Sequence, residues 1–530
     1  MDVDSLPEWL GHQPLIETVQ LQLTPPHLGD NTADLDRLLR VLRQQGYQDI
    51  QVHPLRIGQL AEQIRQSRYQ VSAVLGFTPC HWELLDVKAG TGPVAPLAFA
   101  IDLGSSRLAF YLLDLDQGRI IAQESVANPQ IPHGEDILSR INYARDAKAR
   151  QNLQGLLIDS FNDTMGRMLA ELGLAAADVY AVATAGNTTM SHFLLGLDAS
   201  GICREPYIPV ANQLPWLHAQ DLGLQVFDRA LVYVFPNVGS YFGGDLIAGI
   251  LASGMHRSGE INILVDVGTN AEVVVGNRDW LIACAGAAGP ALEGGVVERG
   301  MMANPGAIDR VRIDPQSLEP HFSVLGGKKP LGICGSGLID LVAEMFGAGI
   351  LTIQGKINTG LESPRIVTTA DGPAYVVAFA NETDDGQDLQ VSEIDIGILL
   401  KSKAAMYTIL NVITRKVGVG FGDLKHFYVA GSFGNHIDPA MAVRIGMMPD
   451  LPLAIYQGLG NTAGRGAAMV LLDRSLIGEI ERICRQITYV ELNVNMELMN
   501  EFRGALFLPH TDPSLFPSVN IPERAYAKGG

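Results

Sequence analysis

The stretch LAFAIDLGSS at residues 97–106 decides the fold. Its first seven residues are almost all apolar, which is typical of a strand buried on both faces of a sheet. The strand ends in Asp102 and runs into Gly104 and two serines, so a carboxylate and several small polar residues meet at a tight turn. The segment Asp266-Val267-Gly268-Thr269-Asn270 repeats these parts after a second apolar strand. The repeat predicts two related α/β halves.

Each turn has the parts of a phosphate-binding hairpin. Gly104 and Gly268 have no Cβ, so backbone N–H groups can approach a phosphate closely. The carboxylates of Asp102 and Asp266 repel phosphate, but they can hold a hydrated Mg²⁺ that bridges the phosphates. We therefore expect both aspartates to be catalytic, metal-binding residues. The alternative is a pair of structural turns whose hydroxyls cap the backbone. Short donors follow each glycine, namely Ser105, Ser106, Thr269 and Asn270.

Three more glycine-containing segments follow predicted strands. Thr184-Ala-Gly-Asn187 is one, and its Asn187 is a candidate nucleotide contact. In the second, Gly431-Ser432-Phe433-Gly434, we expect a turn whose bare backbone lines an adenosine pocket. The alternative is an ordinary turn after a strand. The third, Gly460–Ala468, has small residues that permit close packing of two helices or two halves of the protein.

Several other polar residues are weaker candidates. Glu293 follows the second hairpin and could orient water or a metal-bound water, although a carboxylate is also favoured at a helix N-terminus. Gly335 and Ser336 open a predicted helix and are a second candidate nucleotide contact. Cys334 precedes them without a neighbouring His or Lys that would lower its thiol pKa, which favours a packing role. For the remaining charged residues we expect roles outside the nucleotide site. His192 is predicted to lie in the core or at an interface, and Lys401 and Lys403 on a solvated face of a helix.

Periodicity divides the chain into three parts. We expect a small α/β module and linker over residues 1–95, a first half over 96–255, and a second half with a C-terminal extension over 256–530. The segment Lys88–Pro96 is rich in glycine and proline, so it is predicted to be the linker. The clearest predicted helices run from about Ser392 to Val417 and from Gly460 to about Asp473.

Composition restricts the class of protein. The 530 residues are 47% hydrophobic and 18% charged, which indicates a globular chain. The formal net charge of −19 argues against nucleic-acid binding, because phosphate neutralisation needs Lys and Arg. We expect neither a secretory signal nor a membrane span. The five cysteines are odd in number and far apart, which predicts free thiols in a cytoplasmic protein.

In chain order, the five motifs resemble the phosphate-1, connect-1, phosphate-2, adenosine and connect-2 motifs of the superfamily of acetate and sugar kinases, heat-shock chaperones and actin. The resemblance spans residues 97–475. It implies two ribonuclease-H-like (actin-like) halves around a nucleotide cleft that binds ATP and Mg²⁺. It also implies that hinge motion couples the nucleotide state to closure of the halves.

Several segments resemble one family within this superfamily, the reductive activators of corrinoid proteins. This resemblance covers nearly the whole chain, and many non-adjacent segments agree in order. The matching segments are Gly186–Met190 with His192, Tyr207–Pro209, Pro236-Asn237 with Gly243–Asp245, Ala288–Gly294, Cys334–Gly337 and Leu508–Asp512.

The family resemblance implies an ATPase whose partner is a corrinoid protein of a methyltransferase system. Such activators use ATP to promote reduction of the partner's inactive Co(II) to Co(I). Family members commonly carry an iron–sulfur domain, but this sequence has no cysteine run of that kind, so we expect no cluster within it. Electrons would then come from a missing cluster domain or from a separate ferredoxin-type donor. A homodimer is also implied.

Two other functions stay open at this point. A small-molecule kinase of the same superfamily would need a general base near an acceptor hydroxyl and a substrate pocket. No sugar-binding signature is evident in the sequence. A nucleotide-gated scaffold of the kind that forms actin-like filaments is the third class, and the net acidity does not decide against it.

Overall fold

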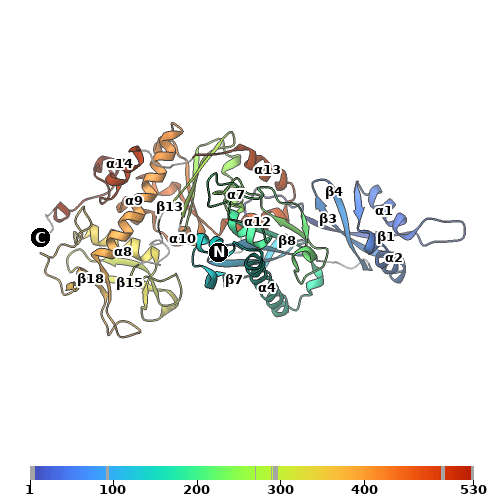
Figure 1. Cartoon of the computed structure of the whole chain (residues 1–530), viewed down its shortest axis with the longest axis horizontal. Helices are drawn as coiled ribbons and strands as arrows, with labels where there is room; N and C mark the ends of the chain where they lie inside the picture. The colour runs from blue at the N-terminus through green and yellow to red at the C-terminus, as the bar shows by residue number, and fades with distance from the viewer. Residues whose placement is uncertain are drawn as a thin grey trace. The chain divides into compact units, whose positions relative to one another are not determined.

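The computed structural model describes residues 6–90, 95–268, 270–287, 289, 297–490 and 496–526. The chain forms two compact units (Figure 1). The first comprises Met1–Ala252 and Asn461–Arg485, and the second comprises Ser253–Gly460 and Gln486–Gly530. The sequence had assigned the whole of 256–530 to the second half, whereas the contacts of Asn461–Arg485 place this segment in the first unit.

The N-terminal module is a four-stranded sheet with two helices on one face (Figure 1). The sheet order is β1-β3-β4-β2, and leucine, isoleucine and valine side chains fill the core between sheet and helices. Strand β4 includes Lys88, which the sequence assigned to the linker. The elements are β1 (Ile16–Gln22), α1 (Asp34–Gln44), β2 (Ile50–Val52), α2 (Ile57–Gln66), β3 (Gln70–Thr78) and β4 (His81–Ala89).

A six-stranded mixed sheet forms the centre of the first unit, in the order β7-β6-β5-β8-β10-β9. The apolar stretch at 97–103 becomes the central strand β5, which is antiparallel to β6 and parallel to β8. Its elements are β5 (Leu97–Leu103), β6 (Arg107–Asp114), β7 (Arg119–Ala127), α3 (Ile137–Tyr143), α4 (Ala147–Leu172), β8 (Val179–Gly186), α5 (Thr188–Leu194), β9 (Leu217–His218), α6 (Ala219–Leu222), β10 (Leu231–Val234) and α7 (Gly244–Ser253).

The second unit repeats the topology of five of these six strands. Its six-stranded sheet has the order β21-β20-β11-β12-β13-β22, so β11 takes the place of β5, and β20 that of β8. The predicted α/β class with two ribonuclease-H-like halves is confirmed. The strands are β11 (Asn262–Val267), β12 (Asn270–Gly276), β13 (Leu281–Ala287), β20 (His426–Ala430), β21 (Tyr456–Gly460) and β22 (Ile487–Tyr489).

Two three-stranded sheets and several helices complete the second unit. The sheets have the orders β15-β14-β16 and β17-β18-β19. These elements are β14 (Ala307–Ile313), β15 (Pro320–Val324), β16 (Gly332–Ile333), α8 (Gly335–Gly347), β17 (Ile366–Thr369), β18 (Gly372–Ala378), β19 (Leu389–Ser392), α9 (Glu393–Lys416), α10 (Gly431–His436), α11 (Pro439–Arg444) and α14 (Met496–Ala505).

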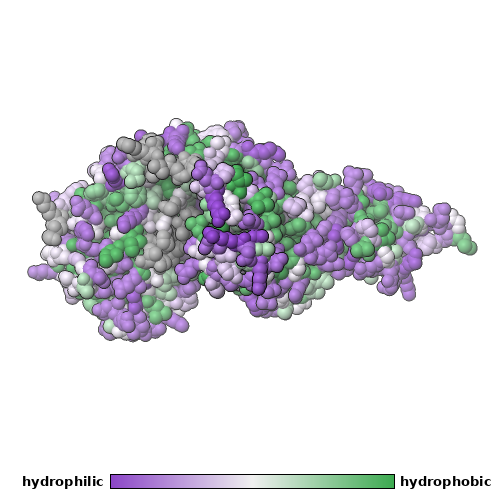
Figure 2. Space-filling view, viewed as in Figure 1, coloured by the Kyte–Doolittle hydropathy of each residue, from purple (hydrophilic) through white to green (hydrophobic). Residues whose placement is uncertain are grey.

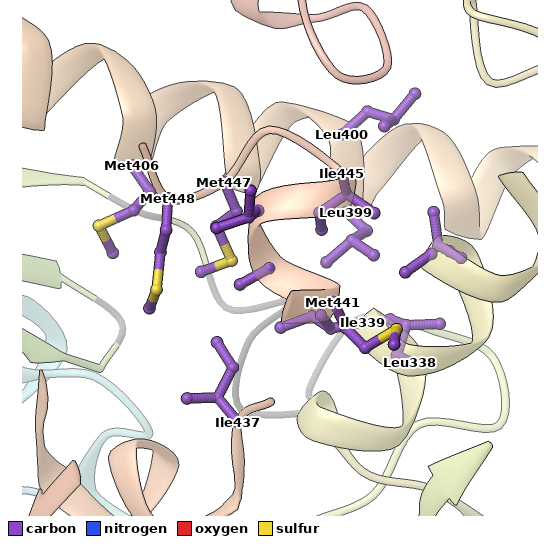
Figure 3. Packing of buried hydrophobic residues seen from close by; sticks show 14 of the residues in the cluster. Leu338, Ile339, Leu399, Leu400, Met406, Ile437, Met441, Ile445, Met447 and Met448 are labelled. Atoms are coloured by element: carbon purple, nitrogen blue, oxygen red, sulfur yellow. The ribbon is translucent and has the colours of Figure 1, made fainter. Parts of the chain in front are cut away.

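Helix α9 is the central helix of this unit. A capping box starts it, because Ser392 Oγ accepts from Asp395 N at 3.2 Å while Asp395 Oδ2 accepts from Ser392 N at 2.9 Å. Methionine and leucine side chains, including Leu399, Met406 and Met447, pack tightly between its buried face and α11 (Figure 3). Among the described residues only α9 is long and apolar enough to cross a membrane, but 72% of its most apolar stretch is buried in the protein.

Helix α12 (Thr462–Leu472) returns the chain to the first unit and packs on β5 and β8, and α13 (Leu476–Gln486) follows it. Hydrophilic residues are interspersed with smaller hydrophobic areas over the face shown in Figure 2. All five cysteines are free thiols, and Cys284 and Cys334 are buried.

Candidate nucleotide-binding site

The first hairpin places Asp102 one residue before the end of β5. There it pairs with Ala109 of β6 and with Ala185 of β8. The turn beyond it requires glycine, because a Cβ on Gly104 would lie 2.4 Å from the backbone oxygen of Arg107. The half-buried turn residues Gly104–Ser106 therefore present backbone N–H groups and hydroxyls beside the carboxylate, as a phosphate-binding turn requires.

Asn128 donates two hydrogen bonds to the backbone of this turn. Its side-chain Nδ2 donates to the carbonyl oxygen of Gly104 at 2.8 Å, and its backbone N–H donates to Ser106 O at 2.9 Å. The side chain is itself buried, and its Oδ1 accepts from Gln130 N. Sequence reasoning missed Asn128, because two strands, β6 and β7, separate it from the turn. Only its Asn-Pro dipeptide gave a local signal for a turn.

Asn461 contacts the carboxylate of Asp102 directly. Its Nδ2 donates to Asp102 Oδ2 at 2.7 Å, and its Oδ1 accepts from Gly464 N at 2.8 Å. Tyr111 lies beside both groups, where burial and the nearby negative charge of Asp102 raise the pKa of its hydroxyl. The connect-2 segment thus supplies a side chain to the first hairpin, which its small residues alone did not indicate.

Asn187 stands at the same end of the sheet, because Gly186 pairs with Leu103 of β5. Its Oδ1 accepts from Met190 N at 2.9 Å, so it is the N-cap of α5. The backbone of the Gly243 segment packs against it, since a Cβ on Gly243 would lie 2.3 Å from Asn187 Cα. The predicted contact Asn187 therefore adjoins the Asp102 hairpin within the first unit.

The second hairpin repeats this arrangement in the second unit. Asp266 is again one residue before the end of its strand, and it pairs with Ala430 of the parallel strand β20. On β12 its partner is Glu272, where the first unit has Ala109. Because directly opposed residues point to the same face, the carboxylates of Asp266 and Glu272 belong to the same face of the sheet. Sequence reasoning missed Glu272, although it is the one acidic residue in a strand that is otherwise largely apolar.

The glycine after β20 lies against Asp266. Gly431 has φ of +81°, and a Cβ there would approach Asp266 Oδ1 to 3.2 Å. The sequence predicted an open turn at Gly431–Gly434, but the segment forms the short helix α10. Gly434 allows this, because a Cβ would lie 2.3 Å from Val429 O. Ser432 and Phe433 lie in this helix.

The Asp266 site fits a divalent cation. Burial raises the pKa of this carboxyl to about 6, against a backbone hydrogen bond from Val267 that lowers it. A bound cation would favour the ionised form and reverse the shift. Among the described residues no three His, Cys, Asp or Glu form a metal cage. One or two carboxylates completed by phosphates and waters are the usual ligands of Mg²⁺.

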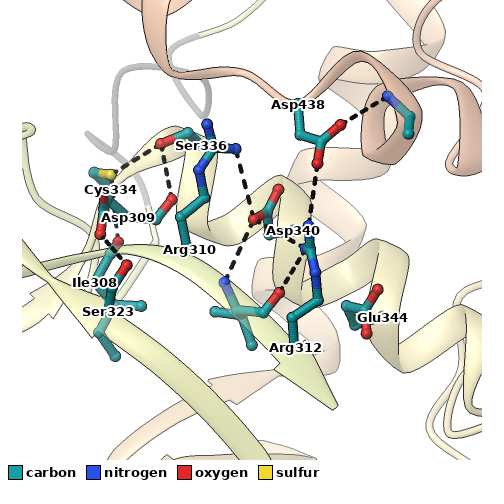
Figure 4. Close-up of polar contacts among 12 residues, drawn as sticks. Ile308, Asp309, Arg310, Arg312, Ser323, Cys334, Ser336, Asp340, Glu344 and Asp438 are labelled. Atoms are coloured by element: carbon teal, nitrogen blue, oxygen red, sulfur yellow. Dashed lines mark hydrogen bonds and ion pairs between the residues drawn. The ribbon is translucent and has the colours of Figure 1, made fainter. Parts of the chain in front are cut away.

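The start of α8 is bonded to the neighbouring strand β14 (Figure 4). Ser336 Oγ donates to the backbone oxygen of Asp309 at 3.3 Å and lies 3.3 Å from Cys334 Sγ. Gly337 permits close packing, since a Cβ would lie 2.3 Å from a backbone oxygen of β14. These contacts give Ser336 and Gly337 a structural role, and the nucleotide contact of Gly335 and Ser336 stays a prediction. Cys334 is buried, as expected of a packing residue.

The remaining candidates have mixed outcomes. Glu293 and Thr269 lie outside the described residues, and Asn270 begins β12. His192 is buried, with Nδ1 2.7 Å from Thr188 O and Nε2 accepting from Val210 N, which fits the structural interpretation. The prediction for Lys403 was wrong. It is fully buried, because the C-terminal segment covers that face of α9.

Comparison with known families decides what kind of protein this is. Models described as the RACo linker region, the RACo middle region and the C-terminal ASKHA domain of RACo match residues 10–92, 97–258 and 260–520. A solved structure of a "Reductive activator for corrinoid,iron-sulfur protein" is 35% identical, with a TM-score of 0.89 over 97% of this chain and 82% of that chain. The chain belongs to the RACo family.

Two curated relatives support the assignment to the RACo family. The corrinoid activation enzyme RamQ of Eubacterium limosum is 28% identical over 418 residues, which cover 77% of this chain and 70% of RamQ. The [Co(II) methylated amine-specific corrinoid protein] reductase of Methanosarcina barkeri is 23% identical over 435 residues, 76% of this chain and 75% of that enzyme. The predicted family resemblance is therefore confirmed.

Proposed function

We propose that this chain binds Mg²⁺–ATP through the Asp102 and Asp266 hairpins and hydrolyses it to drive the reductive activation of a corrinoid protein. The observation that carries the proposal is the duplicated hairpin. Each central strand ends one residue after an aspartate, and each parallel neighbour continues through a glycine into a helix. The names of the relatives in the RACo family support the choice of a corrinoid partner.

The residues divide the chemistry between them. Asp102 and Asp266 would hold Mg²⁺, which neutralises charge on the phosphates when it is bound. Backbone N–H groups of the two turns would bind phosphate oxygens. Glu272 lies opposite Asp266, where its carboxylate can orient the attacking water and accept a proton from it. Glu293 is the other candidate for this role from the sequence.

ATP would supply free energy for an unfavourable electron transfer. Moving one electron uphill by about 59 mV costs about 1.4 kcal/mol, so a gap of a few hundred millivolts costs several kcal/mol. We propose that binding of the corrinoid protein shifts the cobalt potential and that ATP turnover releases the tightly bound partner. The electrons would come from a ferredoxin-type iron–sulfur donor. The five free thiols support a reducing, cytoplasmic location.

The test uses the purified chain with ATP, Mg²⁺, a low-potential reductant and a corrinoid protein in the Co(II) state. We expect ATP-dependent appearance of the Co(I) spectrum. Asp266→Ala should abolish it, and Glu272→Gln should slow ATP hydrolysis at least about 100-fold while nucleotide binding persists. Phosphorylation of a sugar or carboxylate without any effect on the corrinoid would instead establish a kinase. Nucleotide-dependent filaments without either activity would establish a scaffold.

A further inference from the structure

Asn461 joins the start of helix α12 to the first hairpin. One end of its amide caps the helix, with Oδ1 2.8 Å from Gly464 N, and the other end donates to Asp102 Oδ2 at 2.7 Å. An amide carries its donor and its acceptor on two separate atoms. Asp and Ser can also cap a helix, but an ionised Asp has no donor, and Ser has only one oxygen on a shorter side chain. Asn461 therefore connects the Asp102 carboxylate to the first turn of α12 and restricts the orientation of this carboxylate.

The sides of α12 are held as firmly as its start. A Cβ on Gly464 would lie 2.3 Å from a ring carbon of Tyr111 on β6. A Cβ on Gly466 would lie 2.6 Å from the Ala248 side chain on α7. Both approaches are possible only without a side chain at the helix position. Because packed elements move as rigid bodies, α12 follows β6 and Asp102 when these shift.

The far end of α12 is bonded to the backbone of the N-terminal module. Carbonyl oxygens of the last helical turn accept from this segment, with Leu15 N donating to Leu471 O at 2.9 Å and Gln13 N donating to Leu472 O at 3.1 Å. A helix end normally leaves these carbonyls for water or a cap. Here the chain that enters β1 is the cap, so the module is attached to the helix.

Arg474, two residues beyond α12, reinforces this attachment. Its Nη1 donates to Glu17 Oε1 at 2.5 Å and to Pro14 O at 2.9 Å. Its guanidinium also lies 4.8 Å from the ring centroid of Trp82 on β4, within the range of a cation–π contact. The junction thus engages the first and last long strands of the module's sheet.

We propose that Asn461 is a positioning residue for Asp102 and that α12 transmits the binding of a magnesium nucleotide at Asp102 to the N-terminal module. The 11 residues of α12 span about 16 Å, so a carboxylate and a domain this far apart share one rigid element. The inference rests on the proposed nucleotide binding but not on corrinoid activation.

Two variants separate positioning from helix capping. Asn461→Ser and Asn461→Asp both keep a good N-cap. Ser lacks the reach to Asp102, and Asp places a negative charge against it. We expect the Kd for Mg²⁺–AMP-PNP to rise about ten-fold in Asn461→Ser, or about 1.4 kcal/mol, and further in Asn461→Asp. The Kd for AMP-PNP in EDTA should stay unchanged, because only the metal form uses the Asp102 orientation.

A matched control addresses a general effect of cap replacement. Asp146 caps α4 by accepting from Ala149 N at 2.9 Å. Asp146→Ser makes the same class of change away from Asp102, and it should leave both nucleotide affinities at the wild-type values. Melting temperatures of the three variants show whether each protein is folded. An equal loss of affinity with and without Mg²⁺ in the Asn461 variants would overturn the positioning role.

Hydrogen exchange measures the response of the module. In the wild type, saturating Mg²⁺–AMP-PNP should change the exchange rate of the Gln13 and Leu15 amides by several-fold. In Asn461→Ser the same amides should not respond at saturating ligand. Identical responses in the two proteins would overturn the link through α12. A wild type that binds no nucleotide overturns both this inference and the proposed function, whereas binding without corrinoid reduction overturns the function alone.

Discussion

A Cβ atom on Gly431 would lie 3.2 Å from Oδ1 of Asp266. At this distance the methyl group of an alanine displaces the carboxylate, and the φ of +81° adds backbone strain. We expect Gly431→Ala to weaken Mg²⁺–AMP-PNP binding about ten-fold or more, measured by calorimetry.

Gly386→Ala is the control, because Gly386 has φ of +70° and nothing within 4 Å. Gly386→Ala should lower the free energy of unfolding by about 1 kcal/mol, as Gly431→Ala does, without any change in the affinity for Mg²⁺–AMP-PNP. Equal affinities for the two variants would contradict the assignment of Asp266.

The clamp on the first hairpin gives a second prediction. Asn128→Ala removes the donor that holds the Gly104 carbonyl and leaves that group unsatisfied. We expect a stability loss of about 1–3 kcal/mol in urea unfolding, together with weaker nucleotide binding because the phosphate turn loosens.

Asn277 provides the comparison for Asn128. It makes the same pair of bonds, with Nδ2 donating to Gly259 O and Oδ1 accepting from Asp279 N, in a turn without a proposed ligand. Asn277→Ala should lose stability but keep the wild-type nucleotide affinity. If both variants bind nucleotide as the wild type does, Asn128 holds the turn for stability alone.

The local parts of this site were predictable from the sequence. An apolar strand, a terminal aspartate and a glycine turn are consecutive residues, so Asp102 and Asp266 could be placed correctly at their strand ends. The repeat of the motif likewise predicted the repeated sheet topology. These features depend on short-range sterics and on burial of whole strands, which composition and periodicity express directly.

The long-range parts were not predictable. Asn461 reaches Asp102 across 359 positions of sequence, and no local pattern marks the pair. Glu272 gains its place from the strand register opposite Asp266. Lys403 was predicted to lie on a solvent-exposed helix face, but the C-terminal segment packs over this face in the structure. Each depends on a tertiary contact, which overrides local preference.

Asp340 of α8 predicts a specific pH dependence of stability. It is fully buried and ion-paired with Arg310 and Arg312 on β14 (Figure 4), yet burial raises the pKa of its carboxyl to about 6. The folded state therefore binds the proton more tightly than the unfolded state, whose pKa is 3.8. Its contribution to stability is complete below about pH 4 and is lost as the pH rises through 6.

Asp340→Asn removes this dependence. We expect the stability of the variant relative to the wild type to increase by up to about 3 kcal/mol between pH 4 and pH 7, measured by urea unfolding. Asp314→Asn should show the opposite sign, and only below about pH 4, because backbone hydrogen bonds from Ser317 and Gln316 lower the pKa of Asp314 from 3.8. A pH-independent difference for Asp340→Asn would show that the arginines keep this carboxylate ionised throughout.

Lys403 predicts how the C-terminal segment is attached. Its Nζ donates to the carbonyl oxygens of Phe507 and Pro509, and burial lowers its pKa well below 10.5. Lys403→Met leaves both buried carbonyls without this donor, so we expect a loss of about 2–4 kcal/mol and faster proteolysis after Ala505. Lys401→Met, on the exposed face of the same helix, should change neither the stability nor the rate of proteolysis.

Because the unfolded state binds the proton of Lys403 more tightly than the folded state does, the wild type should gain stability over Lys403→Met as the pH rises from 7 toward 10. A constant difference over this range, or intact C-terminal protection in Lys403→Met, would show that other contacts hold the segment.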